Sequence, residues 1–168
     1  PDHSELHKAH PEMIPYIKAF IYKSWKELEI KIQVNSTYRS PIEQQDEINK
    51  WIANGRQGVR PAAPGTSYHE VGLALDFQPY LPPDYKVILG KAPLGASEEE
   101  IEIHKKDWIA TSLPALGESL NLRWGGPFKG NYDPVHFDLG NVFSGDQKKN
   151  LLARAASAGV DPVLLEIV

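Results

Sequence analysis

The chain has 168 residues, a net charge of −4 and a hydrophobic fraction of 41%, which are ordinary values for one globular domain with a sizeable core. A net acidic chain is not expected to bind nucleic acid, and no apolar run approaches the roughly 20 residues that span a bilayer. Because the chain has no cysteine, disulfides and thiolate metal sites are excluded, and any metal must be held by histidine and carboxylate groups.

The first third of the chain predicts a helix, a strand and a second helix, in that order. Apolar residues recur at helical spacing over residues 11–28, and apolar and polar residues then alternate over 30–35, as in a half-buried strand. Ser40 and Glu43 have the spacing of a capping box, in which the two side chains satisfy backbone N–H groups at a helix start. We expect this second helix to end near Ala53.

The middle of the chain alternates regular elements with segments rich in glycine and proline. Residues 55–67 are predicted to be a loop and residues 73–78 a second strand. Residues 79–96 form an irregular excursion, and the longer segment 79–105 could form a lip over a binding cleft. A helix is expected over 97–121 with a break near Pro114, because proline interrupts the backbone hydrogen bonds of a helix.

The last third predicts strand-like segments at 123–126 and 134–139 and a final helix over 145–158 that ends at Gly159. A few strands mixed with helices are typical of an α+β fold. We therefore predict one domain over residues 1–168, built from a small, mostly antiparallel sheet with helices packed on one side.

Two segments, 67–76 and 124–137, combine metal-ligand residue types with a glycine-punctuated backbone. In chain order they contain His69, Asp76, Asp133 and His136. Three such side chains suit a zinc ion, and the fourth could accept a proton from a water on it. Zinc with three protein ligands keeps one position open for chemistry, whereas a structural zinc site is normally closed by four ligands. The pattern therefore indicates a hydrolase.

Alternation along the strands brings two of these residues to one face of the sheet. Asp76 and His136 each have apolar neighbours of opposite parity, so both are expected to project away from the core. Arg39 has the parity of the polar residues in the first strand and is expected on the same face. Ala74 is small and shares that face, so it leaves room beside Asp76.

Glycine and proline are expected to bring the other two residues to the same place. His69 lies at an odd offset from Asp76, and Gly72 supplies a bend that could return its side chain to the site. Pro134 favours an extended conformation of Asp133 at the mouth of the strand, from which the carboxylate could reach a water on the metal without ligating the metal. Any one of these residues alone would more often be an ordinary polar residue, so the hypothesis depends on the joint pattern.

Four motifs occur in a fixed order along the chain. They are Ser-Thr-Tyr-Arg-Ser at 36–40 with Gln44, Ser-x-His-x-x-Gly-x-Ala-x-Asp at 67–76, Trp-Gly-Gly-x-Phe at 124–128 and Asp-x-x-His-Phe at 133–137. Together they resemble the zinc D-alanyl-D-alanine metallopeptidase family, which includes D-Ala-D-Ala carboxypeptidases and the L-alanyl-D-glutamate endopeptidases found among phage endolysins. The resemblance covers about residues 11–140 and implies the fold that these peptidases share with the Hedgehog signalling domain. Thr37 stands where the family commonly has glycine.

The resemblance also implies a role for each residue of the site. It implies one zinc ion with three protein ligands, which are His69, Asp76 and His136. It implies that Asp133 is the general base and that Arg39 binds or polarises the scissile carbonyl. Gln44 and Ser67 are implied to line the substrate site.

The Trp-Gly-Gly-x-Phe motif, and an aspartate in place of glutamate at position 133, favour the L-alanyl-D-glutamate endopeptidase branch. The expected substrate is the stem peptide of bacterial peptidoglycan, cleaved by a monomer at the cell wall or in the periplasm. The alternatives are a D-Ala-D-Ala carboxypeptidase and, from another class, a non-catalytic zinc-binding interaction domain. The residues from Pro1 onward are not a signal peptide, so we expect a phage-released lysin or a processed or excised domain.

Overall fold

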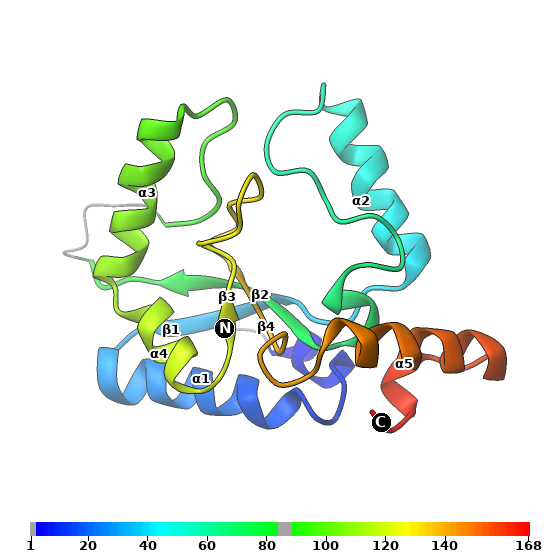
Figure 1. The fold of residues 1–168 in the computed structure, drawn as a ribbon. Coiled ribbons are helices and arrows are strands. Elements are labelled where there is room, and N and C mark those ends of the chain that lie inside the picture. Colours follow the sequence, from blue (N-terminus) through cyan, green and yellow to red (C-terminus); the bar gives the residue numbers. More distant parts are fainter. Residues whose placement is uncertain (1–2, 84–88) are drawn as a thin grey trace.

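The computed structural model describes residues 3–83 and 89–168 (Figure 1). The α-helices and strands of these residues, in chain order, are α1 (Ile14–Leu28), β1 (Lys31–Ser36), α2 (Pro41–Ala53), β2 (Ala74–Tyr80), α3 (Glu98–Ala110), α4 (Leu113–Ser119), β3 (Arg123–Trp124), β4 (His136–Asp138) and α5 (Gly145–Ala158). The 3-10 helices of the same residues are η1 (Ser4–Lys8), η2 (Tyr68–Val71) and η3 (Pro162–Leu164). No helix in the described part of the chain has the length and hydropathy needed to cross a membrane.

The strands form one sheet with the order β1-β2-β4-β3, in which every neighbouring pair is antiparallel. Helix α1 lies along one face of this sheet, whereas α2 and α3 rise beyond the opposite face, on either side of the segment that joins β3 to β4 (Figure 1). The predicted α+β fold with an antiparallel sheet is therefore confirmed. The sheet has one face for the core and a second face that can carry polar side chains.

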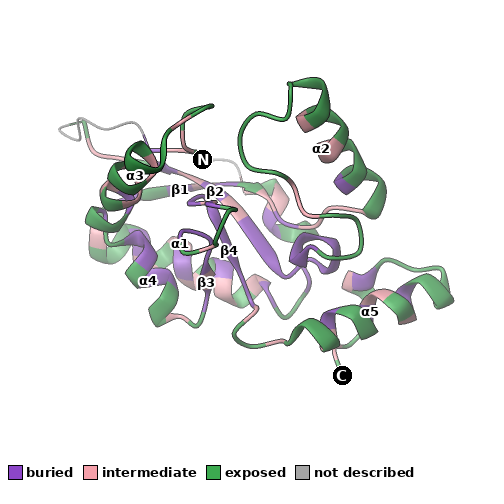
Figure 2. Cartoon of the chain, turned by 45° about the horizontal axis from the view of Figure 1, so that its top comes forward, coloured by how far each residue is buried: buried purple, intermediate pink, exposed green. Residues whose placement is uncertain are grey.

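The core lies between α1 and the sheet, and a cluster of aromatic rings forms its centre. Phe77 of β2 and Phe137 of β4 stack with their ring centroids 5.4 Å apart, and Phe20 of α1 meets them edge-on at 5.2 and 5.1 Å. Strand β4 and most of β2 are buried, whereas the outer sides of α2 and α5 are exposed (Figure 2). Burying each ring contributes about 1.5–3 kcal/mol to folding. The cluster therefore fixes the orientation of β2 and β4.

Serine capping boxes begin α2, α3 and α5. In α2 the hydroxyl of Ser40 accepts a hydrogen bond from the backbone N–H of Glu43, and the Glu43 carboxylate accepts one from the N–H of Ser40, as predicted. The same reciprocal pair begins α3 at Ser97 and α5 at Ser144. A cap of this kind contributes about 1 kcal/mol. Gly159 ends α5 in a left-handed conformation with φ of 68°, also as predicted.

The interruption expected near Pro114 in the helix over 97–121 is confirmed as a break that separates two helices. Helix α3 ends at Ala110, and Ser112 adopts φ of 65°, a left-handed conformation that an α-helix does not accommodate. Pro114 then occupies the first turn of α4, where its missing N–H would have had no helical partner. The break therefore precedes the proline, which helps to begin a helix and does not kink one.

Strand β1 departs from the alternation that its sequence suggests. A register shift between Val34 and Ser36 inserts one residue into the pairing with β2 and places Ser36 opposite Asp76. The strand ends at Ser36. The expectation that strand parity carries Arg39 to the site is therefore wrong, and this residue reaches the polar face from the segment that follows the strand.

The excursion expected at 79–96 begins slightly later than predicted, because β2 continues to Tyr80. Residues 84–88, which belong to the expected lip, lie outside the described residues. On their C-terminal side, Leu89 is buried in the core, and the indole N–H of Trp108 in α3 donates a hydrogen bond to the carbonyl of Gly90 at 3.0 Å. This end of the excursion is therefore anchored to both the core and α3.

Candidate metal centre

Two of the predicted ligands face each other across neighbouring strands. Asp76 of β2 lies directly opposite His136 of β4, while the adjacent Phe77 and Phe137 point into the core. Ala74 lies opposite Asp138 in the same pairing. The alternation of the two strands therefore places the carboxylate and the imidazole together on the polar face, as predicted from parity.

His69 reaches the same place from η2, just before β2 begins. The hydroxyl of Ser67 caps η2 by accepting a hydrogen bond from the N–H of His69, and the buried Glu70 carboxylate completes the capping box. Gly72 then turns the chain with φ of 70°, and a Cβ at this position would lie 2.6 Å from the backbone nitrogen of His10. The bend predicted at Gly72 is therefore present, and both its conformation and its surroundings require glycine.

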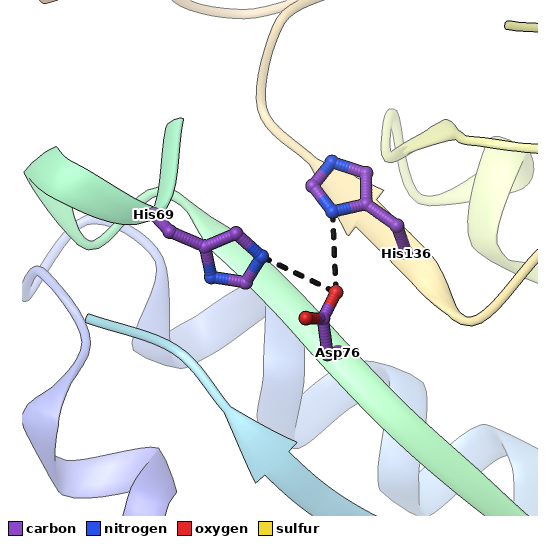
Figure 3. A group of neighbouring side chains, drawn as sticks. All are labelled: His69, Asp76 and His136. Carbon is purple, nitrogen blue, oxygen red and sulfur yellow. Dashed lines mark hydrogen bonds and ion pairs between the residues drawn. The ribbon is translucent and has the colours of Figure 1, made fainter. Parts of the chain in front are cut away.

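The three side chains converge on one point (Figure 3). The Nε2 atom of His69 lies 3.2 Å from Oδ1 of Asp76, and the Nδ1 atom of His136 lies 3.3 Å from the same oxygen. One ligand atom from each of the three residues lies within 4.8 Å of the others. Two imidazole nitrogens and one carboxylate oxygen are the donor set of a catalytic zinc site with three protein ligands.

The outer nitrogen of each imidazole already has an acceptor. Nδ1 of His69 lies 2.8 Å from the carbonyl oxygen of Thr37, and Nε2 of His136 lies 2.8 Å from Oδ2 of Asp138. Each outer nitrogen must therefore carry its proton, so a neutral ring turns the lone pair of its inner nitrogen toward Asp76. Two lone pairs beside a carboxylate are mutually repulsive unless a cation lies among them. The donor set thus fits a metal ion, with oriented ligands of the usual kind.

The charges of the three candidate ligands and Asp138 shift the pKa values of Asp76 and His136 so that both residues favour their charged forms. Burial raises the pKa of Asp76, but the charges and hydrogen bonds of His69 and His136 outweigh it and hold this pKa well below its usual range. Burial lowers the pKa of His136, but hydrogen bonds to Asp138 and Asp76 outweigh this and raise the pKa to about 10. Without a metal, a proton on His136 therefore supplies part of the positive charge that the two carboxylates require.

Asp138 and Arg123 extend the site beyond the predicted residues. Arg123 donates to both oxygens of Asp138, at 2.8 and 2.7 Å, and its guanidinium lies between the rings of Tyr68 and Phe128 at 5.3 and 5.0 Å. The role of Asp138 could have been suspected from the sequence, because Asp138 lies two residues after His136 and therefore projects from the same face of the strand. The partner Arg123 could not be identified without the pairing of β3 with β4.

Asp133 lies on the β3–β4 segment, beside the three candidate ligands. Its backbone N–H donates to the carbonyl of Gly125 at 3.1 Å, and a Cβ on that glycine would lie 2.2 Å from the carbonyl oxygen of Asp133. The Oδ1 atom of Asp133 is buried and has no hydrogen-bond partner among the described residues. Burial and the charge of Asp76 raise the pKa of Asp133, and His136 and Lys91 offset part of this rise. A buried carboxylate with an unoccupied acceptor atom is suited to receive a proton.

Arg39 is positioned by its side-chain contacts. Its guanidinium donates to Oδ2 of Asp76 at 3.3 Å, to the Ser36 hydroxyl at 3.3 Å and to Oε1 of Gln44 at 3.0 Å. Gln44 is itself buried and donates to the carbonyl of Ala62 at 2.7 Å. Gln44, predicted to line the substrate site, therefore also orients Arg39, just as Ser67 orients η2.

The site opens into a cleft of about 200 Å³. Every residue predicted for the site lines it, namely Arg39, Gln44, Ser67, His69, Asp76, Asp133 and His136. Its walls come from the segment between α2 and η2, from Lys91 and from the β3–β4 segment. The structure therefore brings all of the predicted site residues around one cavity.

Two supports outside the cleft were not recognised from the sequence. Nδ1 of His104 on α3 lies 2.7 Å from the hydroxyl of Tyr132, the residue before Asp133. From α5, the ammonium of Lys148 donates to the carbonyl of Thr66 and lies 4.6 Å from the centre of the Tyr68 ring. Helices at the two ends of the site therefore hold the segments that carry the candidate base and His69.

The sequence of residues 61–139 matches the model of a family described as D-alanyl-D-alanine carboxypeptidase. This segment contains the three candidate ligands and Asp133, whereas Arg39 and Gln44 precede it. A comparison with curated proteins found no match.

The solved structures that are similar to the chain include the following three. The L-Ala D-Glu endopeptidase ChiX of Serratia marcescens is 18% identical with a TM-score of 0.44, over 80% of this chain and 83% of that chain. The D,D-pentapeptidase VanY of a VanB-type vancomycin-resistance cassette, in complex with Zn(II), is 16% identical with a TM-score of 0.49, over 94% and 84%. VanYB in complex with D-alanine-D-alanine is 16% identical with a TM-score of 0.48, over 90% and 78%. At such low identities, the specificities of these enzymes do not transfer to this chain.

Proposed function

We propose that this chain, a member of the zinc D-alanyl-D-alanine metallopeptidase family, hydrolyses the stem peptide of bacterial peptidoglycan as an L-alanyl-D-glutamate endopeptidase. The observation that carries the proposal is the convergence of His69, Asp76 and His136 beside Asp133, whose buried Oδ1 has no partner among the described residues. Three oriented ligands next to a carboxylate available for proton transfer are what a hydrolytic metal site requires.

The three ligands would hold one zinc ion. When bound, zinc supplies a Lewis acid that polarises the scissile carbonyl and lowers the pKa of a coordinated water toward neutrality. Thr37 and Asp138 keep the two imidazoles in the tautomers that leave their inner nitrogens available as ligands. These contacts support the assignment of zinc as the cofactor.

Asp133 accepts the proton of the attacking water and then donates it to the nitrogen of the leaving group. Its raised pKa makes it a stronger base than an ordinary surface aspartate. Arg39, anchored by Gln44, directs its positive charge into the cleft and can stabilise the negative charge that develops on the carbonyl oxygen. In this proposal Gln44 and Ser67 line the substrate path and also position Arg39 and His69.

The choice of the endopeptidase branch depends on the sequence motifs. Trp124, Gly125, Gly126 and Phe128 form the Trp-Gly-Gly-x-Phe pattern, and Asp133 stands in place of glutamate. The description of the matched family favours the alternative, a D-Ala-D-Ala carboxypeptidase. A non-catalytic metal-binding domain on the same fold is disfavoured, because Asp133 and Arg39 both line the cleft. The proposed place of action is the bacterial cell wall, where a monomeric enzyme of the endolysin type would act.

The test is mass spectrometry of the muropeptides released from purified peptidoglycan by the zinc-loaded protein. An endopeptidase of this kind separates L-Ala from the D-Glu that follows it, whereas a carboxypeptidase removes only the terminal D-Ala, so the product masses differ. Zinc content is measured in the same sample. Stoichiometric zinc with no cleavage of any stem peptide would show a binding module and overturn the proposal.

A further inference from the structure

The cleft carries as many cationic as anionic side chains, although the whole chain has a net charge of −4. Among the described residues, its cations are Arg39, Arg60, Lys91 and Arg123, and its carboxylates are Glu47, Asp76, Asp133 and Asp138. A divalent ion on the three ligands would add two positive charges. The loaded cleft therefore has an excess of positive charge and concentrates anionic ligands.

Most of these charges already have partners within the protein. The ion pairs are Arg39 with Asp76, Arg123 with Asp138, and Glu47 with Lys50. Arg60 and Lys91 make no ion pair with any carboxylate of residues 3–83 or 89–168, and both side chains are exposed. These two cations are therefore available to a negatively charged group of a ligand.

The two residues come from different walls of the cleft. Arg60 lies on the segment between α2 and η2, and Lys91 lies between β2 and α3 (Figure 1). The guanidinium of Arg60 lies 6.0 Å from the centre of the Trp51 ring, a contact that restrains it. Lys91 lines the same cleft as Asp133, and its positive charge lowers the pKa of that carboxyl. An anion bound by this pair would therefore lie in the cleft that contains the candidate ligands and Asp133.

We propose that Arg60 and Lys91 form a subsite that binds a carboxylate of the substrate, an inference that rests on the proposed function. The enzyme would then prefer peptides that have a free carboxylate near the scissile bond. Two carboxylates of the stem peptide have this chemistry. One is the α-carboxylate of D-Glu, which stays free when the peptide continues through the γ-carboxyl, and the other is the carboxylate at the peptide's C-terminus. Amidation of either group removes its charge and little else.

The experiment uses the zinc-loaded protein and three matched stem peptides. The first has a free D-Glu α-carboxylate and an amidated C-terminus, the second has an amidated α-carboxyl and a free C-terminus, and the third is amidated at both. We expect kcat/KM to be about five- to tenfold higher for one singly amidated peptide than for the third, mainly through KM. The peptide that retains the advantage identifies which carboxylate is bound.

The variants Arg60→Gln and Lys91→Gln remove the charges at exposed positions that the fold does not require. Each should abolish most of the advantage of the preferred peptide, whereas Lys129→Gln, an exposed lysine outside the cleft lining, should preserve it. Calorimetric binding of the three peptides to zinc-loaded Asp133→Asn protein measures the same preference without turnover.

Equal kcat/KM and equal affinity for all three peptides would overturn the subsite, as would a preference that persists in both variants. Absence of cleavage would instead refute the proposed function, and the binding measurement would still decide on the subsite. The two proposals can therefore fail separately.

Discussion

Oδ2 of Asp138 lies 2.8 Å from Nε2 of His136, on the side of the imidazole that faces away from Asp76. The contact fixes which ring nitrogen carries a proton, and Arg123 fixes the carboxylate in turn by donating to both of its oxygens. The orientation of one candidate ligand thus depends on a pair of residues that would never touch a metal.

Replacing Asp138 by asparagine should weaken metal binding about 10- to 100-fold, because His136 loses the negative charge that orients and polarises it. Competition with a chromogenic chelator measures the affinity. Asp46→Asn, on the exposed surface of α2, changes the net charge equally and should leave the affinity unaltered. An unchanged affinity in Asp138→Asn would mean that the contact with His136 does not support the ligand.

Metal affinity should rise with pH. The pKa of His136 is raised to about 10 in the metal-free fold, so below that pH a proton must leave before the metal binds. Between about pH 6.5 and 9, the apparent affinity should increase roughly tenfold per pH unit. The proton on His136 also stabilises the metal-free fold. This stabilisation is fully present below about pH 6.5, the pKa of histidine in the unfolded chain, and it is lost as the pH rises through about 10, the pKa of His136 in the fold. Calorimetry in buffers of different ionisation enthalpy counts the protons released, and a count of zero would contradict this account.

Replacing Asp133 by asparagine should lower kcat by about 10²–10⁴, because the amide cannot accept the proton of the attacking water. Metal content should not change, since Asp133 is assigned as a base and not as a ligand. Both quantities are measured on one preparation, by turnover of a muropeptide and by elemental analysis. Loss of the metal together with activity would make Asp133 a fourth ligand and refute its assignment as the base.

Replacing Gly125 by alanine should displace the β3–β4 segment, because the new Cβ would lie 2.2 Å from the carbonyl oxygen of Asp133. We expect a loss of about 1–3 kcal/mol in the free energy of unfolding, as for other overpacking substitutions, and a lower kcat. Gly145→Ala is the matched control, since its Cβ would meet no atom within 4 Å. Denaturant unfolding and turnover of the two variants check the difference, and equal effects would refute the steric argument.

Replacing Tyr132 by phenylalanine removes the hydroxyl that contacts His104 and keeps the ring. We expect a loss of about 0.5–1.5 kcal/mol in the free energy of unfolding, as for other lost hydrogen bonds. Because the next residue is Asp133, kcat should fall while metal affinity stays unchanged. Tyr22→Phe, at an exposed position, controls for the substitution itself. A double-mutant cycle with His104→Ala should give a coupling free energy of similar size, and additive effects would exclude the contact.

The residues that strand alternation governs could be predicted from the sequence. Asp76 and His136 each lie between two buried apolar residues, so the face on which their side chains project was determined by a period of two residues. Gly72 was informative for a related reason, because a bend at this position was needed to bring the side chain of His69 to Asp76 and His136. These predictions required no knowledge of which strands pair.

The residues that depend on pairing or on loop paths could not be predicted. The prediction that strand parity carries Arg39 to the site was wrong. The bulge in β1 is set by its pairing with β2 and cannot be recognised from the alternation of apolar and polar residues. Arg123 meets Asp138 only because β3 pairs with β4, and β3 is too short to show a pattern. His104 and Tyr132 lie far apart in sequence and meet through the path of an irregular segment.

The strands that carry Asp76 and His136 are adjacent in the sheet, yet the two residues are 60 positions apart in the sequence. An ion shared by them would act as a removable cross-link that closes a long loop, which an unfolded chain could maintain only at an entropic cost. Free metal at 1,000 times its dissociation constant would favour the native chain by about 4 kcal/mol. Scarcity of the metal would then weaken the enzyme twice, through the loss of its reactivity and through a shorter lifetime of its fold.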